Sequence, residues 1–310
     1  MISILNAKAW AVKTFFNFWG RLGGAILNFG CLRDVDLSRD ISYGPGPEQR
    51  LDILRPQSAK QRSLPVLVYF HGGGWISADK RIYDGIAATL AQNSYLVFNV
   101  NYRLAPGSRF PAALQDAAHA IDWIERNLAG YGGDSSSIVL AGDSAGAQIA
   151  SWYACALQKR MLFKQVGIDS AKARMPLKGL LLFYGVYDFD AVLDAHFPFI
   201  RLYAKSFLGS GMDAYVLNSQ VASPIRHVSS RFPPVFLCAG ERDGLYAQSL
   251  AFAETLEKSG VVCKKLLFSR AYRADHGFLF FRWLRSSRMA FAAAGDFLLS
   301  LSESAGMASE

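Results

Sequence analysis

The sequence predicts an α/β protein with a mostly parallel central sheet flanked by helices. Short, nearly continuous apolar runs recur from about residue 34, as expected of strands buried on both faces. Helical stretches alternate with these runs, which is the pattern of strand–helix–strand units. The chain of 310 residues is 51% hydrophobic and 19% charged, an ordinary composition for a globular protein with a large core.

The expected elements follow from these runs in chain order. Two strands at Val35–Tyr43 and Arg50–Leu54 flank a turn-forming Gly-Pro-Gly-Pro segment and are expected to form a hairpin. The expected buried strands are Val66–Phe70, Leu96–Val100, Ile138–Ala141, Gly179–Tyr184, Val235–Ala239 and Cys263–Phe268. The expected helices are Ala112 to about Leu128, Ala145–Lys159, Tyr246–Lys258 and Ser287–Leu301.

Between Asp188 and Ser223 the alternation stops, and the segment is aromatic and helical in pattern. Open α/β sheets bind their ligands beyond the carboxyl ends of the strands, so an insertion here is expected to cover a site. We therefore expect a core of residues 34–188 and 223–303, and a helical cap of residues 1–33 and 189–222.

The first thirty residues predict an amphipathic helix. Lys8, Lys13 and Arg21 interrupt the segment, so no uncharged stretch reaches the ~18 residues that a membrane span needs. The same charges, without a convincing cleavage site, argue against a signal peptide. Marred only by Lys8, one broad face carries Ile4, Ala11, Phe15, Phe18, Trp19 and Leu22. Two interpretations stay open: the helix packs on the rest of the protein, or residues 1–22 lie on a membrane surface.

The net charge of +8 raises the question of an anionic partner. The basic residues are scattered and no nucleic-acid motif accompanies them, so we expect no nucleic-acid partner. The four cysteines lie far apart without metal-binding spacing, which favours a reduced, cytoplasmic protein with no metal site. Membrane association through the first helix and a homodimer are left open.

Gly142-Asp143-Ser144-Ala145-Gly146 fits the G-x-S-x-G pattern between an expected strand and an expected helix. A sharp strand-to-helix turn would hold Ser144 in a strained backbone geometry, which small neighbours make tolerable. Such a turn raises the hydroxyl above the sheet, at the positive end of the following helix. We therefore expect Ser144 to be a nucleophile.

A second glycine-rich element, His71-Gly72-Gly73-Gly74-Trp75, directly follows the strand expected at Val66–Phe70. It lacks both the GK(S/T) sequence of a phosphate-binding P-loop and the G-x-G-x-x-G spacing of a dinucleotide-binding loop. Consecutive glycines can instead turn backbone N–H groups toward a substrate oxygen. We expect an oxyanion hole formed by the N–H groups of Gly73, Gly74 and Ala145, with His71 supporting the loop.

These two motifs, together with Tyr102-Arg103-Leu104-Ala105-Pro106 and Phe110-Pro111-Ala112-Ala113-Leu114, resemble the hormone-sensitive-lipase-like esterases, bacterial family IV. The resemblance covers about residues 50 to 285. It implies the α/β-hydrolase fold, a helical cap, no cofactor, and carboxylic esters of short-to-medium acyl chains as substrates. The implied enzyme is a carboxylesterase that works through an acyl-enzyme intermediate.

In this fold the acid and the histidine follow the nucleophile in that order. His276 lies after the last strand and matches the family's His-Gly-Phe, so it is the expected general base. Asp243 follows the strand Val235–Ala239 and aligns with the family's acid. Asp188, at the end of the preceding strand, is the alternative acid.

Aromatic residues of the expected cap, with Trp75, are candidates for the substrate pocket, although they could equally form a packed cap core. The candidates are Trp75, Phe199, Tyr203 and Phe207. Three other functions stay open: an amidase such as kynurenine formamidase, a lipase working at a membrane surface, and a non-catalytic ligand-binding receptor. The intact His276 argues against the receptor.

Overall fold

The computed structural model describes residues 4–59, 62–169 and 176–306, and its centre is an eight-stranded sheet in the order β1-β2-β4-β3-β5-β6-β7-β8. The strands are β1 (Val35–Ser42), β2 (Arg50–Pro56), β3 (Leu64–Phe70), β4 (Leu96–Val100), β5 (Gly133–Asp143), β6 (Leu177–Phe183), β7 (Val235–Gly240) and β8 (Cys263–Phe268). Strands β3 to β8 run parallel, and the predicted hairpin β1–β2 joins them antiparallel through β2 and β4. The predicted fold class is therefore confirmed.

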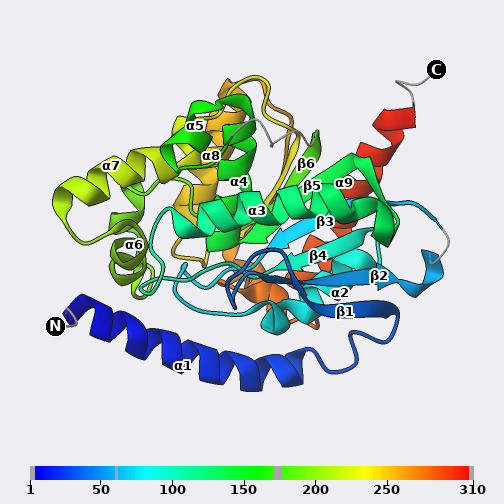
Figure 1. The fold of residues 1–310 in the computed structure, drawn as a ribbon, viewed down its shortest axis with the longest axis horizontal. Helices are drawn as coiled ribbons and strands as arrows, with labels where there is room; N and C mark the ends of the chain where they lie inside the picture. Colours follow the sequence, from blue (N-terminus) through cyan, green and yellow to red (C-terminus); the bar gives the residue numbers. More distant parts are fainter. Residues whose placement is uncertain (1–3, 60–61, 170–175, 307–310) are drawn as a thin grey trace.

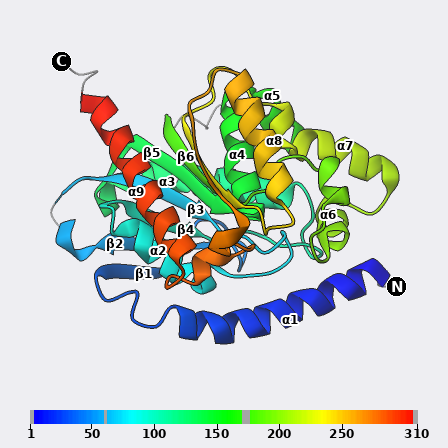
Figure 2. The ribbon, with the colours of Figure 1, turned by 180° about the vertical axis from the view of Figure 1, so that it is seen from behind.

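Helices cover both faces of this sheet, which explains the continuous apolar runs. Along β3, Val66, Val68 and Phe70 join one hydrophobic cluster, and Leu67 and Tyr69 join the other. The first cluster includes residues of α3 (Ala112–Asn127), α4 (Ala145–Gln158) and α8 (Tyr246–Lys258). The second includes residues of α2 (Asp84–Ala91) and α9 (Arg285–Gly306), and Figure 2 shows α9 crossing the back of the sheet. Helix α2 was not predicted.

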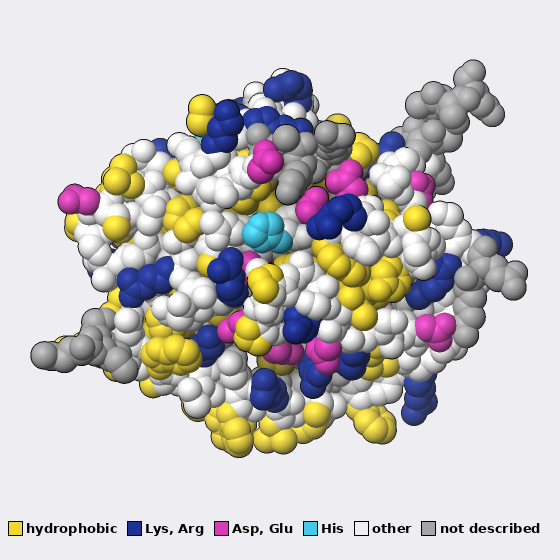
Figure 3. All heavy atoms as spheres, viewed as in Figure 1, with side chains coloured by type: hydrophobic (Ala, Val, Ile, Leu, Met, Phe, Trp, Pro, Cys, Tyr) yellow, Lys and Arg dark blue, Asp and Glu magenta, His cyan; other side chains and the backbone are white. Residues whose placement is uncertain are grey.

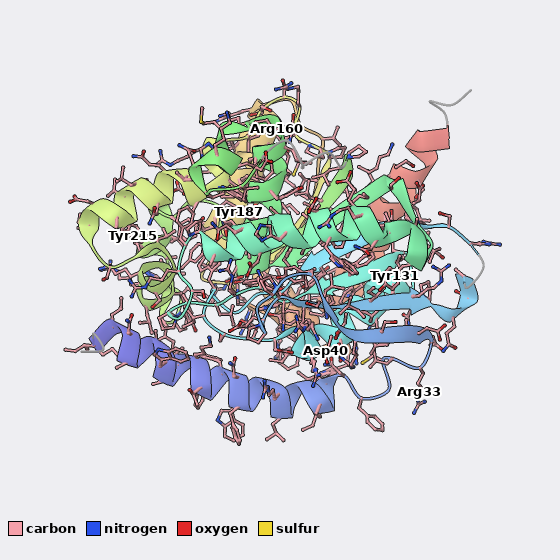
Figure 4. The ribbon with its side chains drawn as sticks, viewed as in Figure 1. Arg33, Asp40, Tyr131, Arg160, Tyr187 and Tyr215 are labelled. Carbon is pink, nitrogen blue, oxygen red and sulfur yellow. The ribbon has the colours of Figure 1, made fainter. Side chains whose placement is uncertain are left out.

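The segment after β6 is helical, as its pattern indicates. It contains α6 (Ile200–Leu208) and α7 (Met212–Ala222), which lie at one end of the sheet in Figure 1. Tyr215 of α7, labelled in Figure 4, donates a 2.7 Å hydrogen bond to the carbonyl of Phe189 and so ties α7 back to the segment that leaves β6. The short elements are η1 (Gln57–Ala59), η2 (Lys80–Tyr83), η3 (Leu128–Tyr131), α5 (Met161–Gln165), η5 (Ala191–Asp194), η6 (Pro224–Arg226), η7 (Arg270–Tyr272) and η8 (Phe278–Phe280).

The long helix α1 (Ile4–Leu27) runs along one edge of the molecule, against η2 and α6 (Figure 1). It packs on the protein, but not through its apolar face: Phe15, Phe18 and Leu22 are exposed, whereas Ala9 and Gly24 are buried. The predicted helix is therefore present, but the face that approaches the protein is the one with small and amide side chains. No helix in the described parts of the chain is both long and apolar enough to span a bilayer.

Candidate active site

Ser144 lies at the bend between β5 and α4, at the carboxyl edge of the sheet. Its backbone has φ 51° and ψ −118°, a combination that few non-glycine residues adopt. The bend leaves no room for larger neighbours: a Cβ on Gly146 would lie 1.9 Å from the carbonyl oxygen of Phe70, and one on Gly142 would lie 2.4 Å from the Gly146 carbonyl carbon. The G-x-S-x-G pattern is thus a steric requirement of this turn.

A chain of hydrogen bonds links Ser144 to His276 and Asp243. The Ser144 Oγ lies 3.0 Å from His276 Nε2, and His276 Nδ1 lies 2.8 Å from Asp243 Oδ2. An ionised carboxylate can only accept, so Nδ1 carries the proton and Nε2 is free to accept the serine proton. The three predicted residues, far apart in sequence, therefore meet at one point.

Loops after β7 and β8 hold the acid and the histidine. Asp243 is nearly fully buried, and its Oδ1 accepts a 2.8 Å bond from the N–H of Leu245. Arg242 bonds Asp275 at 2.9 Å, which ties the two loops together directly beside Asp243 and His276. Both carboxylate oxygens of Asp243 are thus engaged, and the orientation of the imidazole is fixed.

Aromatic rings border the imidazole of His276 on two sides. Tyr184 and Phe197 pack against it at ring-centroid distances of 4.8 and 4.6 Å. Phe197 comes from the segment between β6 and α6, so this helical insertion reaches the imidazole directly.

Asp188, the alternative acid, has a different place. Its Oδ1 accepts a 2.9 Å bond from the backbone N–H of Asp190, and its own N–H donates to Gln248 at 2.8 Å. This is the pattern of a carboxylate that closes a local turn. The structure brings Asp243, not Asp188, to His276.

The glycine loop after β3 turns beneath the same point. Gly73 and Gly74 have φ values of 108° and 60°, and a Cβ on Gly73 would lie 2.2 Å from the Ser77 carbonyl oxygen. The Gly73 carbonyl is occupied by the N–H of Ser77 at 3.0 Å, whereas no bond among the described residues uses the N–H of Gly73 or Gly74. Ala145 is the first residue of α4, where backbone N–H groups lack helical partners. All three predicted donors therefore have N–H groups available for an anionic oxygen.

Asp143 fixes this loop against the serine turn, a role that the sequence reasoning missed. Its buried carboxylate accepts hydrogen bonds from the N–H of Gly72 (2.8 Å), the hydroxyl of Tyr69 (3.0 Å) and the hydroxyl of Tyr83 (3.3 Å). Burial raises the pKa of Asp143 to about 6, against an ordinary value of 3.8. The available signal was a carboxylate at the end of an otherwise apolar strand, beside the catalytic candidate.

His71 is buried and supports the loop from inside. Its Nδ1 lies 2.7 Å from the Gly72 carbonyl, and its ring stacks on Tyr102 at 4.4 Å. Burial lowers the pKa of His71, because the protonated ring would lose its hydration, so the side chain is neutral and donates from Nδ1. It does not contact Ser144 through any described hydrogen bond, and its position fits the predicted support of the loop.

A cavity of about 650 Å³ opens over Ser144. This volume is typical of a site for a small organic ligand. Most of the wall is apolar and comes from α1, the glycine loop, the segment before α6, and η8. The larger apolar side chains of the wall are those of Phe16, Trp75, Ile82, Val186, Phe197, Phe199, Ile200, Tyr203, Phe280 and Phe281.

Three of the four predicted pocket residues lie in this wall: Trp75, Phe199 and Tyr203. Phe207 does not: it is buried behind Trp75, with the two rings stacked at 4.9 Å and an interplanar angle of 8°. The prediction for Phe207 is therefore wrong, because its buried ring packs among Trp75, Phe110 and Phe189 and does not reach the cavity. Helix α1 contributes Phe16 and Gly20 to the wall; residues 1–33 were expected to belong to the cap, but these two were not among the predicted pocket residues.

Within the described residues, no group of three or more His, Cys, Asp or Glu side chains could hold a metal ion.

The groups that the site presents to a substrate are the serine hydroxyl, the imidazole hydrogen-bonded to it, and the backbone N–H groups of the glycine loop and of Ala145.

Comparisons with known proteins agree with this architecture. A family model described as the α/β-hydrolase fold matches residues 67–280. Esterase LipQ of Mycobacterium tuberculosis is 34% identical over 271 residues, which is 84% of this chain and 61% of that protein. The probable carboxylic ester hydrolase LipM of the same organism is 32% identical over 77% of this chain and 56% of its own length. The chain thus spans about 60% of the length of these curated relatives.

Solved structures agree at the level of the fold. Esterase B from Lactobacillus Rhamnosis superposes with a TM-score of 0.87, covering 98% of this chain and 97% of that one at 21% identity. Esterase LipW from Mycobacterium marinum gives a TM-score of 0.78 at 24% identity, covering 97% and 92%. With the family model covering most of the sheet and both glycine motifs, the chain belongs to the α/β-hydrolase family, in the hormone-sensitive-lipase-like branch that its motifs indicate.

Proposed function

We propose that this protein is a carboxylesterase that hydrolyses esters of short-to-medium acyl chains. The observation that carries the proposal is the hydrogen-bonded series Ser144–His276–Asp243 at the floor of an apolar cavity. The curated relatives named as esterases support the same reaction class.

In the first step, Ser144 Oγ attacks the ester carbonyl carbon while His276 Nε2 takes the hydroxyl proton. Asp243 holds the proton on Nδ1 and stabilises the imidazolium that forms. The carbonyl oxygen becomes negative and is met by the N–H groups of Gly73, Gly74 and Ala145. The imidazolium then gives its proton to the departing alcohol oxygen, which leaves an acyl-enzyme.

In the second step, water replaces the alcohol. His276 takes a proton from the water as it attacks the acyl carbon, and the same three donors bind the second tetrahedral oxyanion. Collapse of this intermediate returns the proton to Ser144 Oγ and releases the carboxylic acid. Each residue returns to its starting state, and no cofactor is part of the proposal.

We further propose that residues 1–33 and 189–222 act as a cap over a core of residues 34–188 and 223–303. Phe16 from α1 and Phe199 and Tyr203 from the insertion lie over the catalytic serine as cavity wall. The mostly apolar wall of this cavity of about 650 Å³ suits the acyl chain of an ester. The proposed preference predicts that hydrolysis of p-nitrophenyl esters from acetate to palmitate peaks at short-to-medium chains.

The test of the proposal is the variant Ser144→Ala assayed with p-nitrophenyl butyrate. We expect kcat to fall by about 10⁴-fold or more while the melting temperature stays within a few degrees, because the hydroxyl is the nucleophile. Residual turnover within tenfold of the wild type would overturn the assignment. The wild type assayed with N-formylkynurenine separates the amidase alternative, which predicts a kcat/KM for the formamide above that for the butyrate ester.

A further inference from the structure

Helix α1 turns its apolar face away from the protein. The exposed side chains recur every three or four residues and form one continuous stripe, which we call the outer face of α1. Phe15 is 58% exposed, Phe18 63% and Leu22 52%. The large apolar side chains of this stripe, on the helix and just beyond it, are Ile4, Phe15, Phe18, Trp19, Leu22, Ile26 and Phe29; Trp10 and the cavity residue Phe16 are also exposed but lie outside it. Figure 3 shows hydrophobic side chains gathered along the lower edge of the molecule, where α1 runs in Figure 1.

The inner face of α1 is held on the protein by polar and steric contacts. The outer face is therefore exposed although the helix is firmly packed. Asn17 Oδ1 accepts a 2.8 Å bond from the N–H of Ala78. A Cβ on Gly20 would lie 2.8 Å from Ile82 Cδ1, and one on Gly24 3.3 Å from its Cα. Beyond the helix, Asn28 bonds the N–H of Gly85 at 3.0 Å. Figure 4 shows side chains projecting from α1 on the side away from the protein.

The charges along α1 are all positive. Lys8, Lys13 and Arg21 lie on the helix, and the first acidic residue of the chain is Asp34. Lys8, which interrupts the apolar stripe, and Arg21 are both exposed. The whole chain carries a net charge of +8, which adds to the attraction for a negative surface. An apolar stripe with tryptophan and exposed cations is the composition of helices that lie in the interfacial layer of a bilayer.

The outer face of α1 lies beside the cavity. Phe16 and Gly20 of the same helix belong to the cavity wall, as does Phe281. Phe281 and the neighbouring Trp283 are 41% and 62% exposed. Arg282 between them donates a 2.6 Å bond to the carbonyl of Leu27, so this second apolar pair joins the end of α1.

We propose that α1 docks this protein onto a lipid bilayer that contains anionic phospholipid, with the outer face of α1 in the interfacial layer. The apolar stripe supplies the burial, and the exposed cations of the helix supply attraction to anionic headgroups. A helix of this length lying along one edge presents its stripe to a flat surface, which a bilayer provides. This inference does not depend on the proposed ester hydrolysis, because it concerns where the protein sits.

The first experiment is flotation of the full chain with phosphatidylcholine vesicles that contain 30% phosphatidylglycerol. We expect the wild type to float with these vesicles and to bind pure phosphatidylcholine at least tenfold more weakly. The variant Phe15→Ser/Phe18→Ser/Leu22→Ser should bind the anionic vesicles at least tenfold more weakly than the wild type. A wild type that stays at the bottom of the gradient overturns the proposal.

A matched control replaces three apolar side chains of similar exposure elsewhere: Met161→Ser/Val262→Ser/Leu299→Ser. Met161 begins α5, which lies at the opposite edge from α1 in Figures 1 and 2. This control should float like the wild type. Equal losses of binding in both triple variants would mean nonspecific adsorption and would contradict the proposal. Melting temperatures within a few degrees of the wild type show that both variants are folded.

The charge arm uses Lys8→Glu/Arg21→Glu against the control Lys164→Glu/Lys264→Glu, which makes the same change in net charge. We expect only the first pair to weaken binding to anionic vesicles, by about tenfold, and to reduce its salt dependence. Equal effects of the two pairs would assign the binding to net charge and overturn the role of α1.

Sedimentation velocity separates the lipid surface from a second copy of this chain. The proposal predicts that the Phe15→Ser/Phe18→Ser/Leu22→Ser variant has the same oligomeric state as the wild type. A wild-type dimer that this variant converts to monomer, together with no flotation, would assign the outer face of α1 to self-association and overturn the proposal.

Discussion

The turn between β5 and α4 and the long helix α1 both use glycine to bring two segments into close contact, but they differ in what surrounds them. At the turn, Gly146 meets the carbonyl of Phe70 inside the protein, and Ser144 is 7% exposed. On α1, Gly20 and Gly24 meet Ile82 on one side only, and the opposite side is open. Because the turn is enclosed on all sides, nearly every one of its positions tolerates only particular residue types. Because α1 is contacted on one side, only its inner positions are restricted in this way.

The same difference explains how each segment can fail. In the turn, a single added methyl group has nowhere to go, because backbone atoms form the wall and backbone cannot rotate aside. On the outer face of α1, the aromatic side chains contact one another, as Phe18 contacts Trp19 at a ring-centroid distance of 5.5 Å, so we expect a change there to alter the surface and not the fold. The following substitutions test this contrast from the larger effect to the smaller.

Asp243→Asn tests the catalytic end of the comparison most strongly. The amide would present a donor or a weaker acceptor to His276 Nδ1, which favours the wrong imidazole tautomer. We expect kcat for p-nitrophenyl butyrate to fall by about 10⁴-fold with little change in melting temperature. A decrease below tenfold would mean that the imidazole keeps its tautomer without Asp243 and would contradict the proposed role.

Gly146→Ala tests the steric claim about the turn. Its Cβ would lie 1.9 Å from the Phe70 carbonyl oxygen, so the strand or the helix must shift. We expect a loss of about 4 kcal/mol or more in the free energy of unfolding, measured by urea denaturation, or failure to obtain folded protein. The control Gly130→Ala has no atom within 4 Å of its Cβ and should leave stability nearly unchanged. Equal stability of the two variants would refute the steric explanation.

Asp143→Asn sharpens the comparison through pH. Burial raises the pKa of Asp143 to about 6 from 3.8, so the folded protein holds this proton more tightly than the unfolded chain does. The resulting stabilisation is present below about pH 4 and is lost as the pH rises through 6. Relative to Asp143→Asn, the wild type should lose up to about 3 kcal/mol across this window, since one pKa unit corresponds to about 1.4 kcal/mol. Denaturation of both proteins at several pH values measures it, and a constant difference would contradict it.

Asn17→Ala tests the inner face of α1. It removes the acceptor for the N–H of Ala78, which is part-buried beneath the helix. We expect a loss of about 1 kcal/mol in the free energy of unfolding, measured by urea denaturation. An unchanged stability would mean that water replaces the amide at no cost and would contradict a stabilising role for this hydrogen bond.

Phe18→Ser gives the smallest expected effect and is the most direct way to break the comparison. Because Phe18 is 63% exposed, we expect the free energy of unfolding to change by no more than about 0.5 kcal/mol. A loss of 3 kcal/mol, as for a core phenylalanine, would show that the outer face of α1 is packed in solution.

The sequence predicted most of the sheet, because apolar runs bounded by turns are local patterns. It indicated Ser144 through the G-x-S-x-G pattern, and Asp243 and His276 through their order after the serine and the resemblance to the family. Strand β8 and helix α8 have the predicted limits, since apolar runs bounded by turns define them. Helix α2 was missed because its eight residues are short and nearly all buried, which removes the amphipathic period.

The sequence could not show which face of a helix packs on the protein. The spacing of apolar residues in α1 predicted the apolar stripe but not that the stripe faces outward, since a period carries no information about which side the protein lies on. The same limit applies to Phe207, whose aromatic character suited the cavity wall and the core behind Trp75 equally well. Asp143 was missed because its partners, Tyr69 and Tyr83, lie on elements remote in sequence.

Phe16 and Phe18 are two residues apart on α1, yet Phe16 belongs to the cavity wall and Phe18 does not. Nearby positions of one helix therefore contribute to different properties: the cavity wall in one case and the exposed outer face in the other. Variants at positions 15, 18 and 22 would change the proposed membrane binding and leave the cavity wall as it is. Variants at position 16 would change the cavity wall and leave the outer face of α1 as it is. The proposed membrane binding and the shape of the cavity can therefore be varied separately along one helix.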